Sequence, residues 1–513
     1  MRLPILSLLV ASSWLLGAPR AHAVDPSAFA SGATAAQVID QLEQARQALI
    51  ADKYEDAGKI MEKVLSQAAF AELEPAIQIH GLRIAAYAAT GRKDTLAAHE
   101  FFSVVTEFKD ATADDWAQRA YSALLLESFP DAATSLTTIV KRWPEYLDKE
   151  SEFSQELVQS AVRGLSSGKN DNEKRALLEV LFDANYKTEY GGEPSEYWRD
   201  LAEAAVARND LPAATKYTTR ITDASTLVAM RIDKRFDALV AKDPRAFDVR
   251  AAAEQEVKRL RGFVAKNPRS LGGVVQLTYA LYTVGRFDDM LKTSDAAIAR
   301  IAKAPAKKPA YDDLETQQSW IYNQKANALW SLGRWDDALA AMAAGAKTGE
   351  GGSPNVSQAI NLGFYYDEAG KPREALAGLE GVDWAHSLSP YGRMQLQFVR
   401  YVAYLQLADS GEAEKVLSWF REHQADSKET AQGALLEGGD FDGAAALLVA
   451  RLRDSSERAA ALLEVQDFDL PAQTERAKES EKRRQQLLAR ADVAAAINEY
   501  GRREKFPIVK IGF

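Results

Sequence analysis

The chain has 513 residues, of which 47% are hydrophobic and 27% charged, enough apolar material for several domains or one long repeat array. It contains no cysteine, which excludes disulfides, thiol nucleophiles, zinc–thiolate sites and a lipid-anchored lipoprotein. Its net charge of −10 argues against a nucleic-acid-binding surface, so we expect no nucleic-acid partner.

The N-terminus is typical of a cleavable secretory signal. Arg2 precedes an apolar run, residues 3–16, that is too short to span a membrane comfortably. Ala21-His22-Ala23 then has the small–x–small pattern of a signal-peptidase site. We expect a signal peptide over residues 1–23, cleavage after Ala23, and a periplasmic or secreted mature chain without a membrane span. An N-terminal membrane anchor is the alternative.

A short sequence recurs along the chain: a turn-forming residue, a variable residue, an aromatic or apolar residue, two variable residues and usually Ala. Its seven copies begin at Asp52, Glu127, Asn209, Gly285, Gly333, Gly370 and Gly439. The turn residue ends one helix, the aromatic residue begins the next, and Ala lets the two helices approach. Because one such pair cannot bury its apolar face alone, neighbouring pairs must stack. The pattern predicts an all-α solenoid of stacked antiparallel helix pairs.

These copies resemble tetratricopeptide repeats (TPRs), whose pattern has Trp, small, aromatic and Pro residues at fixed places. The best copy, residues 113–146, carries five of them: Trp116, Ala120, Phe129, Ala132 and Pro144. Residues 195–228 and 356–389 match less completely, and the resemblance extends over most of residues 36–455. It implies a TPR-like superhelix that binds a protein or peptide partner.

We expect two TPR-like arrays, residues 36–240 and 248–455, joined at a seam within Met230–Pro244, where the repeat pattern is lost. Residues 471–513 form a third part, with a charged cap helix over 473–491 and a short extended tail at the C-terminus. The tail would dock on the last helices or add to the sheet edge of a partner.

The sequence contains no recognisable constellation for catalysis, cofactor binding or metal binding. No two of the four histidines beyond the signal have metal-ligand spacing: His80, His99, His386 and His423. Nucleophile-elbow and phosphate-loop motifs are also missing, so we expect no enzyme, no cofactor and no metal. The alternative is a helical envelope enzyme, or enzyme subunit, that acts on glycans with groove carboxylates, for which Asp367 and Glu368 are candidates.

The resemblance implies that the first helix of each repeat lines a concave face. Nine side chains of three successive repeats fall at or beside the positions that point into it and are the expected partner-binding residues: Tyr279, Tyr282, Trp320, Asn323, Asn327, Trp330, Asn361, Phe364 and Asp367. Asn327 and Asn361 match the amides with which peptide-binding members hold an extended backbone. An Asn side chain offers both a donor and an acceptor to a peptide unit.

The match departs from members that clamp a terminal carboxylate, because Asn323 stands where they have Lys. An alternative is that the aromatic side chains only pack between repeats. We therefore expect an exported TPR scaffold or adaptor that binds a protein or peptide in its groove, in envelope assembly, secretion or polysaccharide export. The identity of the partner and the oligomeric state stay open.

Overall fold

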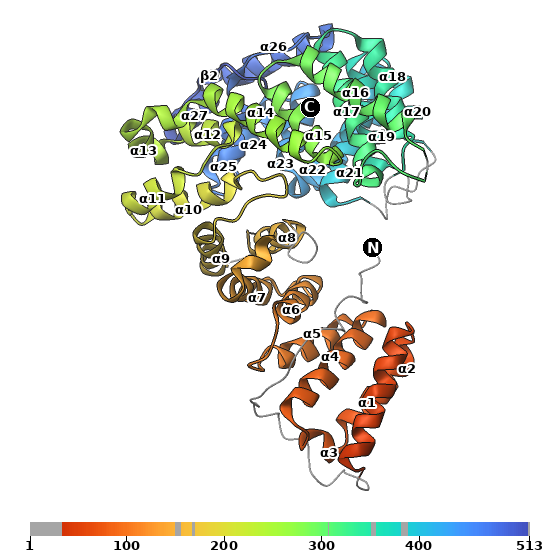
Figure 1. The fold of residues 1–513 in the computed structure, drawn as a ribbon. Helices are drawn as coiled ribbons and strands as arrows, with labels where there is room; N and C mark the ends of the chain where they lie inside the picture. The colour runs from red at the N-terminus through yellow and green to blue at the C-terminus, as the bar shows by residue number, and fades with distance from the viewer. Residues whose placement is uncertain are drawn as a thin grey trace. The chain divides into compact units, whose positions relative to one another are not determined.

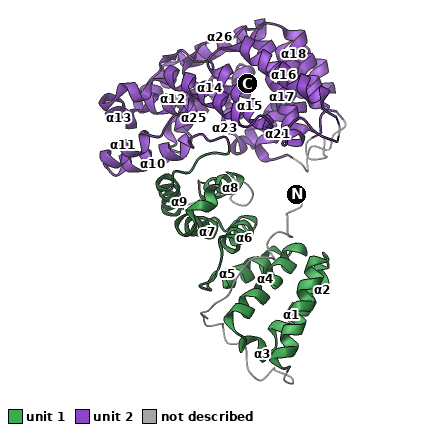
Figure 2. Ribbon diagram, viewed as in Figure 1, with its two compact units in different colours: residues 1–189 green, residues 190–513 purple. Residues whose placement is uncertain are grey.

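A computed structural model describes residues 33–148, 155–166, 170–305, 307–349, 355–380 and 388–510. The expected signal peptide and His386 lie outside these residues. The chain forms two compact units, Met1–Glu189 and Tyr190–Phe513 (Figure 2).

Unit 1 is a row of antiparallel helix pairs (Figure 1). Its helices are α1 (Ala35–Ile50), α2 (Tyr54–Leu65), α3 (Ala68–Ala71), α4 (Pro75–Gly91), α5 (Thr95–Val105), α6 (Ala113–Leu125), α7 (Phe129–Arg142), α8 (Gln155–Ser166) and α9 (Asp171–Asp183), with a 3-10 helix at Pro144–Asp148.

Unit 2 continues with helix pairs and ends in a C-terminal segment that folds back on them (Figure 1). Its first elements are α10 (Ser195–Ala207), α11 (Leu211–Thr218), α12 (Ala224–Ile232), α13 (Asp237–Lys242), α14 (Val249–Lys266), α15 (Leu271–Thr283), α16 (Phe287–Lys303), α17 (Leu314–Ser331) and α18 (Trp335–Ala346). They are followed by α19 (Val356–Glu368), α20 (Pro372–Ala377), α21 (Pro390–Gln406), α22 (Ser410–Glu422), α23 (Lys428–Glu437), α24 (Phe441–Arg453), α25 (Arg458–Glu464), β1 (Asp467–Phe468), α26 (Glu475–Leu488), α27 (Ala491–Tyr500) and β2 (Lys505–Phe506).

The recurring sequence explains the turn inside each helix pair. All seven turn residues have φ between 56° and 82°, the left-handed conformation that ends a helix and that Gly and Asn tolerate best. The second helix begins two residues later, at the aromatic or apolar residue, as in α2, α7 and α18. Two further turns, at Lys93 and Ala408, have the same conformation although their sequences match the motif poorly.

The small residue of the motif lies where the two helices of a pair cross. Ala57, Ala132 and Ala338 are 0% exposed, and so are the equivalent residues of the other four copies, among them Met290. A small side chain at a crossing lets two helix axes approach closely, and each pair then buries its apolar face against its neighbour. The predicted fold class, an all-α solenoid of stacked antiparallel helix pairs, is confirmed.

The expected seam near residues 240–248 lies inside unit 2, whereas the two compact units divide after Glu189. At the seam the regular pairs give way to short helices, namely α12, α13 and the 3-10 helices Lys234–Phe236 and Pro244–Phe247. No helix of the described residues combines the length and the apolar character that crossing a membrane requires.

The C-terminal segment, residues 465–510, lies across the last turns of several first helices of unit 2. Its backbone N–H groups donate to carbonyl oxygens at the ends of three helices: Arg502 to Ile232 of α12, Val509 to Thr283 of α15, and Ala472 to Ser331 of α17, at 2.9–3.2 Å. The last carbonyls of a helix lack partners within the helix. The segment therefore supplies donors that these helix ends need.

The segment is anchored in two ways. Toward its end, β2 pairs in parallel with β1, and Phe506, Ile508 and Val509 are buried. The charged helix α26, in contrast, buries only Leu487 and Leu488 and is held largely by ion pairs. Glu437 at the end of α23 pairs with Arg476 at 3.0 Å and with Arg483 at 2.9 Å. The charged sequence forms helix α26, and the repeats partly cover it.

Candidate partner-binding groove

A cavity of about 570 Å³ opens on the first helices of four successive pairs of unit 2. It is lined by side chains from α15, α17 and α19 and from the start of α21. Seven of the nine expected partner-binding residues line it: Tyr279, Tyr282, Trp320, Asn323, Asn327, Asn361 and Phe364. We call this cavity the groove.

The described residues that line the groove include no Asp, Glu, Lys, Arg or His. They are aromatic, aliphatic, amide and hydroxyl side chains, in a chain of which 27% is charged. Burial raises the pKa of the Tyr279 and Tyr282 phenols, so both stay neutral at physiological pH. The described part of the groove is thus an uncharged surface, which favours ligands whose buried part is uncharged as well.

Three of the side-chain amides in this surface, all Asn, are linked between repeats. The Asn361 Nδ2 donates to Asn323 Oδ1 at 3.5 Å, and the Tyr365 hydroxyl donates to Asn327 Oδ1. These contacts orient the amides, while none of the hydrogen bonds among the described residues uses the Asn327 Nδ2 group. Oriented amides beside flat aromatic rings can hydrogen-bond a peptide backbone and cover its side chains.

The structure places Trp330 in the core between repeats rather than on the groove. Its ring centroid lies 4.8 Å from those of Trp335 and Tyr365, both edge-to-face, and the side chain is buried. The second helix of its own pair and the first helix of the next pair cover it from two sides. For Trp330, therefore, the alternative of packing between repeats is correct.

Asp367 also lies away from the groove, at the C-terminal end of α19. It is 2% exposed, and Gln406 Nε2 donates to its Oδ1 at 3.4 Å and to its backbone oxygen at 3.2 Å. Burial raises the pKa of this carboxyl to about 8, against the opposing effect of Arg476 and with a further rise from Glu368 and Glu437. Asp367 is therefore largely protonated at neutral pH.

The carboxylate pair on which the glycan-enzyme alternative depends is not part of the groove. Glu368 accepts a hydrogen bond from the Thr474 hydroxyl at 3.2 Å and lies 3.6 Å from the Arg476 guanidinium. The C-terminal segment thus covers the end of α19 that carries both acids. Over the described ranges, no group of three or more His, Asp or Glu side chains could hold a metal ion.

The sequence did not point to the fourth wall of the groove, which Tyr391 and Gln395 of α21 supply. This repeat was hard to place because its turn residue is Ala408, which has φ 55° although Ala rarely adopts that conformation. Counting back from that turn in the repeat register puts Gln395 at the position that Trp320 occupies in its own repeat. The repeat register alone therefore gives the position of Gln395, although this residue was not singled out from the sequence.

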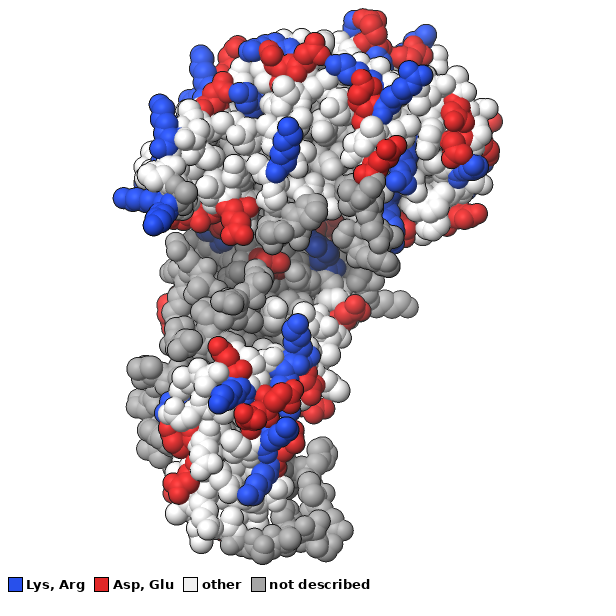
Figure 3. Space-filling model, turned by 90° about the vertical axis from the view of Figure 1, so that its right-hand side faces the viewer, with Lys and Arg blue, Asp and Glu red and all other residues white. Residues whose placement is uncertain are grey.

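On the face of the molecule that Figure 3 shows, acidic and basic side chains of unit 2 are interspersed, with areas between them that carry neither. A nucleic-acid-binding protein gathers positive charge into a stripe or patch instead. The mixed charge on this face agrees with the acidic composition of the chain.

No protein-family model and no curated protein matches the chain. Among solved structures, it is similar to the APC/C hetero-tetramer Cut9–Hcn1, with 12% identity, a TM-score of 0.29 and coverage of 90% of this chain and 96% of that chain. The P58(IPK) TPR domain shares 15% identity, with a TM-score of 0.20 and coverage of 79% and 98%. A Rap protein complexed with competence and sporulation factor shares 12%, with a TM-score of 0.27 and coverage of 88% and 99%.

We draw nothing about function from likenesses at these TM-scores. The repeat geometry of the chain itself is more informative, because nine left-handed turns in the described part of the chain separate paired helices and a small residue is buried at nearly every crossing. By its fold, the chain is a TPR-like helical-repeat protein.

Proposed function

We propose that the protein is an exported scaffold or adaptor that holds an extended, uncharged stretch of a protein partner in the groove. One observation carries this proposal: seven side chains singled out from the repeat register line a single cavity whose described lining residues include no charged side chain. Concave faces of helical repeats are the surfaces with which such proteins bind partners.

The chemistry of the groove favours a peptide stretch without charged side chains. Asn327 and Asn361 offer hydrogen bonds to a backbone, whose donors and acceptors alternate along an extended chain. Trp320, Tyr279 and Phe364 offer flat apolar area at a small entropic cost. A charged side chain buried here would find no opposite charge, and burying an unpaired charge is costly. The volume, about 570 Å³, suits a short stretch of a few residues.

The N-terminal signal pattern supports export, which places the partner in the cell envelope or outside the cell. Envelope assembly, secretion and polysaccharide export are the processes that need such adaptors. Sequencing the N-terminus of the protein isolated from its native source tests this part of the proposal. A mature chain that begins at Val24 supports it, and a retained Met1 in a cytoplasmic fraction contradicts it.

The groove itself is tested with the double variant Asn327→Ala plus Asn361→Ala. The tagged mature protein is purified from its own envelope, the co-purifying partner is identified, and the dissociation constant of the two purified proteins is measured. Each lost amide removes one or two hydrogen bonds of about 1 kcal/mol, so we expect at least a tenfold weaker complex.

The matched control is Asn172→Ala plus Asn498→Ala, two exposed amides on other helices. Circular dichroism must show that both double variants keep the wild-type helix content. If the partner binds the groove variant and the control variant equally well, the proposed site is wrong. If the only ligand retained is a neutral glycan, the partner class is wrong even though the groove is used.

A further inference from the structure

A second cavity of about 570 Å³ in unit 2 has the opposite chemistry to the groove. It lies between the C-terminal end of α16 and the loops that precede α15 and α17. Four of its lining residues are basic, the others are Ala or Pro, and no described lining residue is acidic. The basic residues are Arg269, Arg300, Lys303 and Lys308. We call this cavity the basic pocket.

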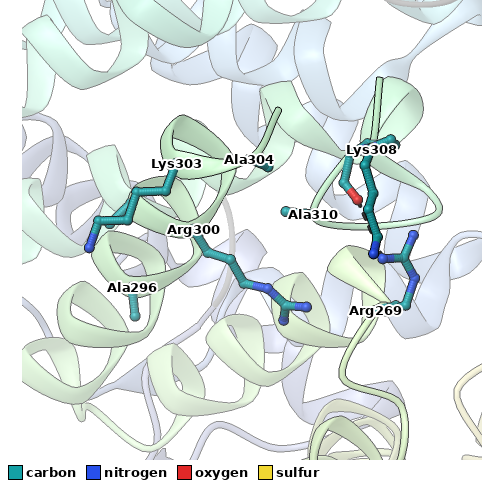
Figure 4. Close-up of a pocket in the computed structure, with 9 residues that line it drawn as sticks. Arg269, Ala296, Arg300, Lys303, Ala304, Lys308 and Ala310 are labelled. Atoms are coloured by element: carbon teal, nitrogen blue, oxygen red, sulfur yellow. Dashed lines mark hydrogen bonds between the residues drawn. The ribbon is translucent and has the colours of Figure 1, made fainter. Parts of the chain in front are cut away.

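The basic side chains of the pocket do not all point in the same direction. In Figure 4, Arg269 and Lys308 lie on one side of the view and Arg300 extends from α16 toward that side, whereas Lys303 extends to the opposite side. Lys303 is the last residue of α16, where a cation stabilises the negative end of the helix dipole. That role accounts for Lys303 without any ligand.

The other three cations come from three separate segments, and only one of them is neutralised. Arg269 forms an ion pair with Asp312. Arg300 is held by two contacts that leave its charge uncompensated: Nη1 donates to the Pro268 carbonyl oxygen, and the guanidinium carbon lies 4.6 Å from the centroid of the Tyr311 ring. Neither Arg300 nor Lys308 has an ion pair with an acidic side chain among the described residues.

Two uncompensated positive charges therefore face one depression in a chain whose net charge is −10. Like charges repel, and an anion bound between them would be attracted by both. The alanines Ala296, Ala299 and Ala310 keep the floor of the pocket shallow and free of bulky groups. A planar guanidinium held in place and a mobile ammonium together suit a phosphate group, which carries about −1.5 to −2 charges at neutral pH.

We propose that the basic pocket binds a phosphate group through Arg300 and Lys308, with Arg269 at its edge. The site is separate from the groove and does not depend on the function proposed for it. The phosphate group can belong to a soluble ion or metabolite or to a lipid headgroup, because the pocket is open to solvent and the same charges serve both.

The test compares two probes on the full mature chain. Inorganic phosphate is titrated by calorimetry at constant ionic strength, with sodium chloride as the compensating salt, so that general screening stays the same. In parallel, vesicles of phosphatidylcholine with and without phosphatidic acid are sedimented with the protein. Whichever probe binds saturably identifies the source of the phosphate group.

The variant Arg300→Gln plus Lys308→Gln should weaken binding of the active probe by at least about tenfold, since both uncompensated charges are lost. The control is Arg245→Gln plus Lys292→Gln, which removes the same charges from exposed positions outside the pocket. Arg300→Lys, which keeps the charge but loses the planar fork, should weaken it by a smaller factor.

All variants change exposed side chains, and circular dichroism confirms that their helix content is unchanged. Equal losses in the pocket variant and the control variant would mean that only net charge matters, and the proposal would then fail. The proposal also fails if neither probe binds saturably.

Discussion

Two regions of unit 2 differ in chemistry. Along the last turns of α12, α15 and α17, the C-terminal segment covers the helix ends and donates hydrogen bonds to their carbonyl oxygens. Along the earlier turns of α17, α19 and α21, the surface is open and forms the groove. The covered region contains many charged side chains in ion pairs, and the open region contains none among its described lining residues.

The difference separates helix ends that the chain itself covers from a surface that it leaves open. The last carbonyl groups of a helix need hydrogen-bond donors from elsewhere. In α12, α15 and α17 the C-terminal segment supplies these donors. What remains open is the part whose polar groups are side-chain amides, which can adapt to a ligand. The comparison predicts that changes in the covered region alter stability, whereas changes in the open region alter binding.

The largest effect should come from Phe506, the buried anchor of the C-terminal segment. It is 1% exposed, and its ring lies 5.9 Å from that of Phe468. Phe506→Ala leaves a cavity, so the free energy of unfolding of unit 2 should fall by about 3–5 kcal/mol. Urea denaturation followed by circular dichroism measures it. Leu470→Ala, at a position 59% exposed in the same segment, is the control and should cost under about 0.5 kcal/mol.

If Phe506→Ala costs no more than the control, the tail is not part of the cooperative core of unit 2. The C-terminal segment would then be held only loosely against the helix ends that it covers. The distinction between a covered and an open region would lose its energetic basis.

A second, smaller effect concerns Asp367, which lies under the segment with a pKa of about 8. In the unfolded chain its carboxyl ionises near pH 4. Below pH 4 both states hold the proton and the site costs nothing. As the pH rises from 4 to 8, the unfolded state releases its proton while the folded state keeps it, so stability is lost across this window. Above pH 8 the loss levels off.

Asp367→Asn removes this titration, since an amide can replace the protonated acid. The variant should gain about 1.4 kcal/mol of stability over the wild type for each pH unit between about 4 and 8, and at pH 4 the two should be nearly equal. Urea denaturation at pH 4, 6 and 8 checks the prediction. Asp40→Asn, at an exposed position on α1, is the control. A constant difference at all three pH values would show that Asp367 is ionised in the folded protein.

Much of this architecture could be predicted from local sequence. The turn residue, the aromatic and the small residue of each copy lie within six positions, and their steric roles follow from helix geometry alone. The repeat register then located the groove, because residues at equivalent repeat positions, such as Asn327 and Phe364, lie on the same face of the first helix of their pair. Trp330 was misplaced, since its exposure depends on how closely Trp335 and the next helix approach it.

The cover over Asp367 could not be predicted from local sequence. Arg476, whose charge acts on Asp367, and Thr474, which contacts Glu368, follow these acids by more than 100 positions, and the charged pattern of α26 is also that of a solvated helix. The pairing of β1 with β2 and the basic pocket have the same origin, because both join segments that are separated along the chain. Non-local contacts of this kind leave no periodic signal.

The smallest effect should come from the ionic anchor of α26. Glu437 accepts hydrogen bonds from Arg476, Arg483 and the Ser480 hydroxyl. Glu437→Gln removes the charge that holds both arginines, which are partly exposed, so the global cost should be only about 1 kcal/mol. Hydrogen exchange of the amides in residues 475–488 should speed up severalfold, and more so at high salt, because screening weakens the ion pairs that remain.

The tail distinguishes local release of α26 from release of the whole segment. In Glu437→Gln the amides of residues 505–510 should keep wild-type protection, because Phe506 and Ile508 are held by apolar burial that salt does not weaken. Glu422→Gln, at an exposed position on α22, is the control and should leave both regions unchanged. If the tail and α26 lose protection together, the segment opens as a single piece. The C-terminal segment would then be a releasable cover over the helix ends that it contacts.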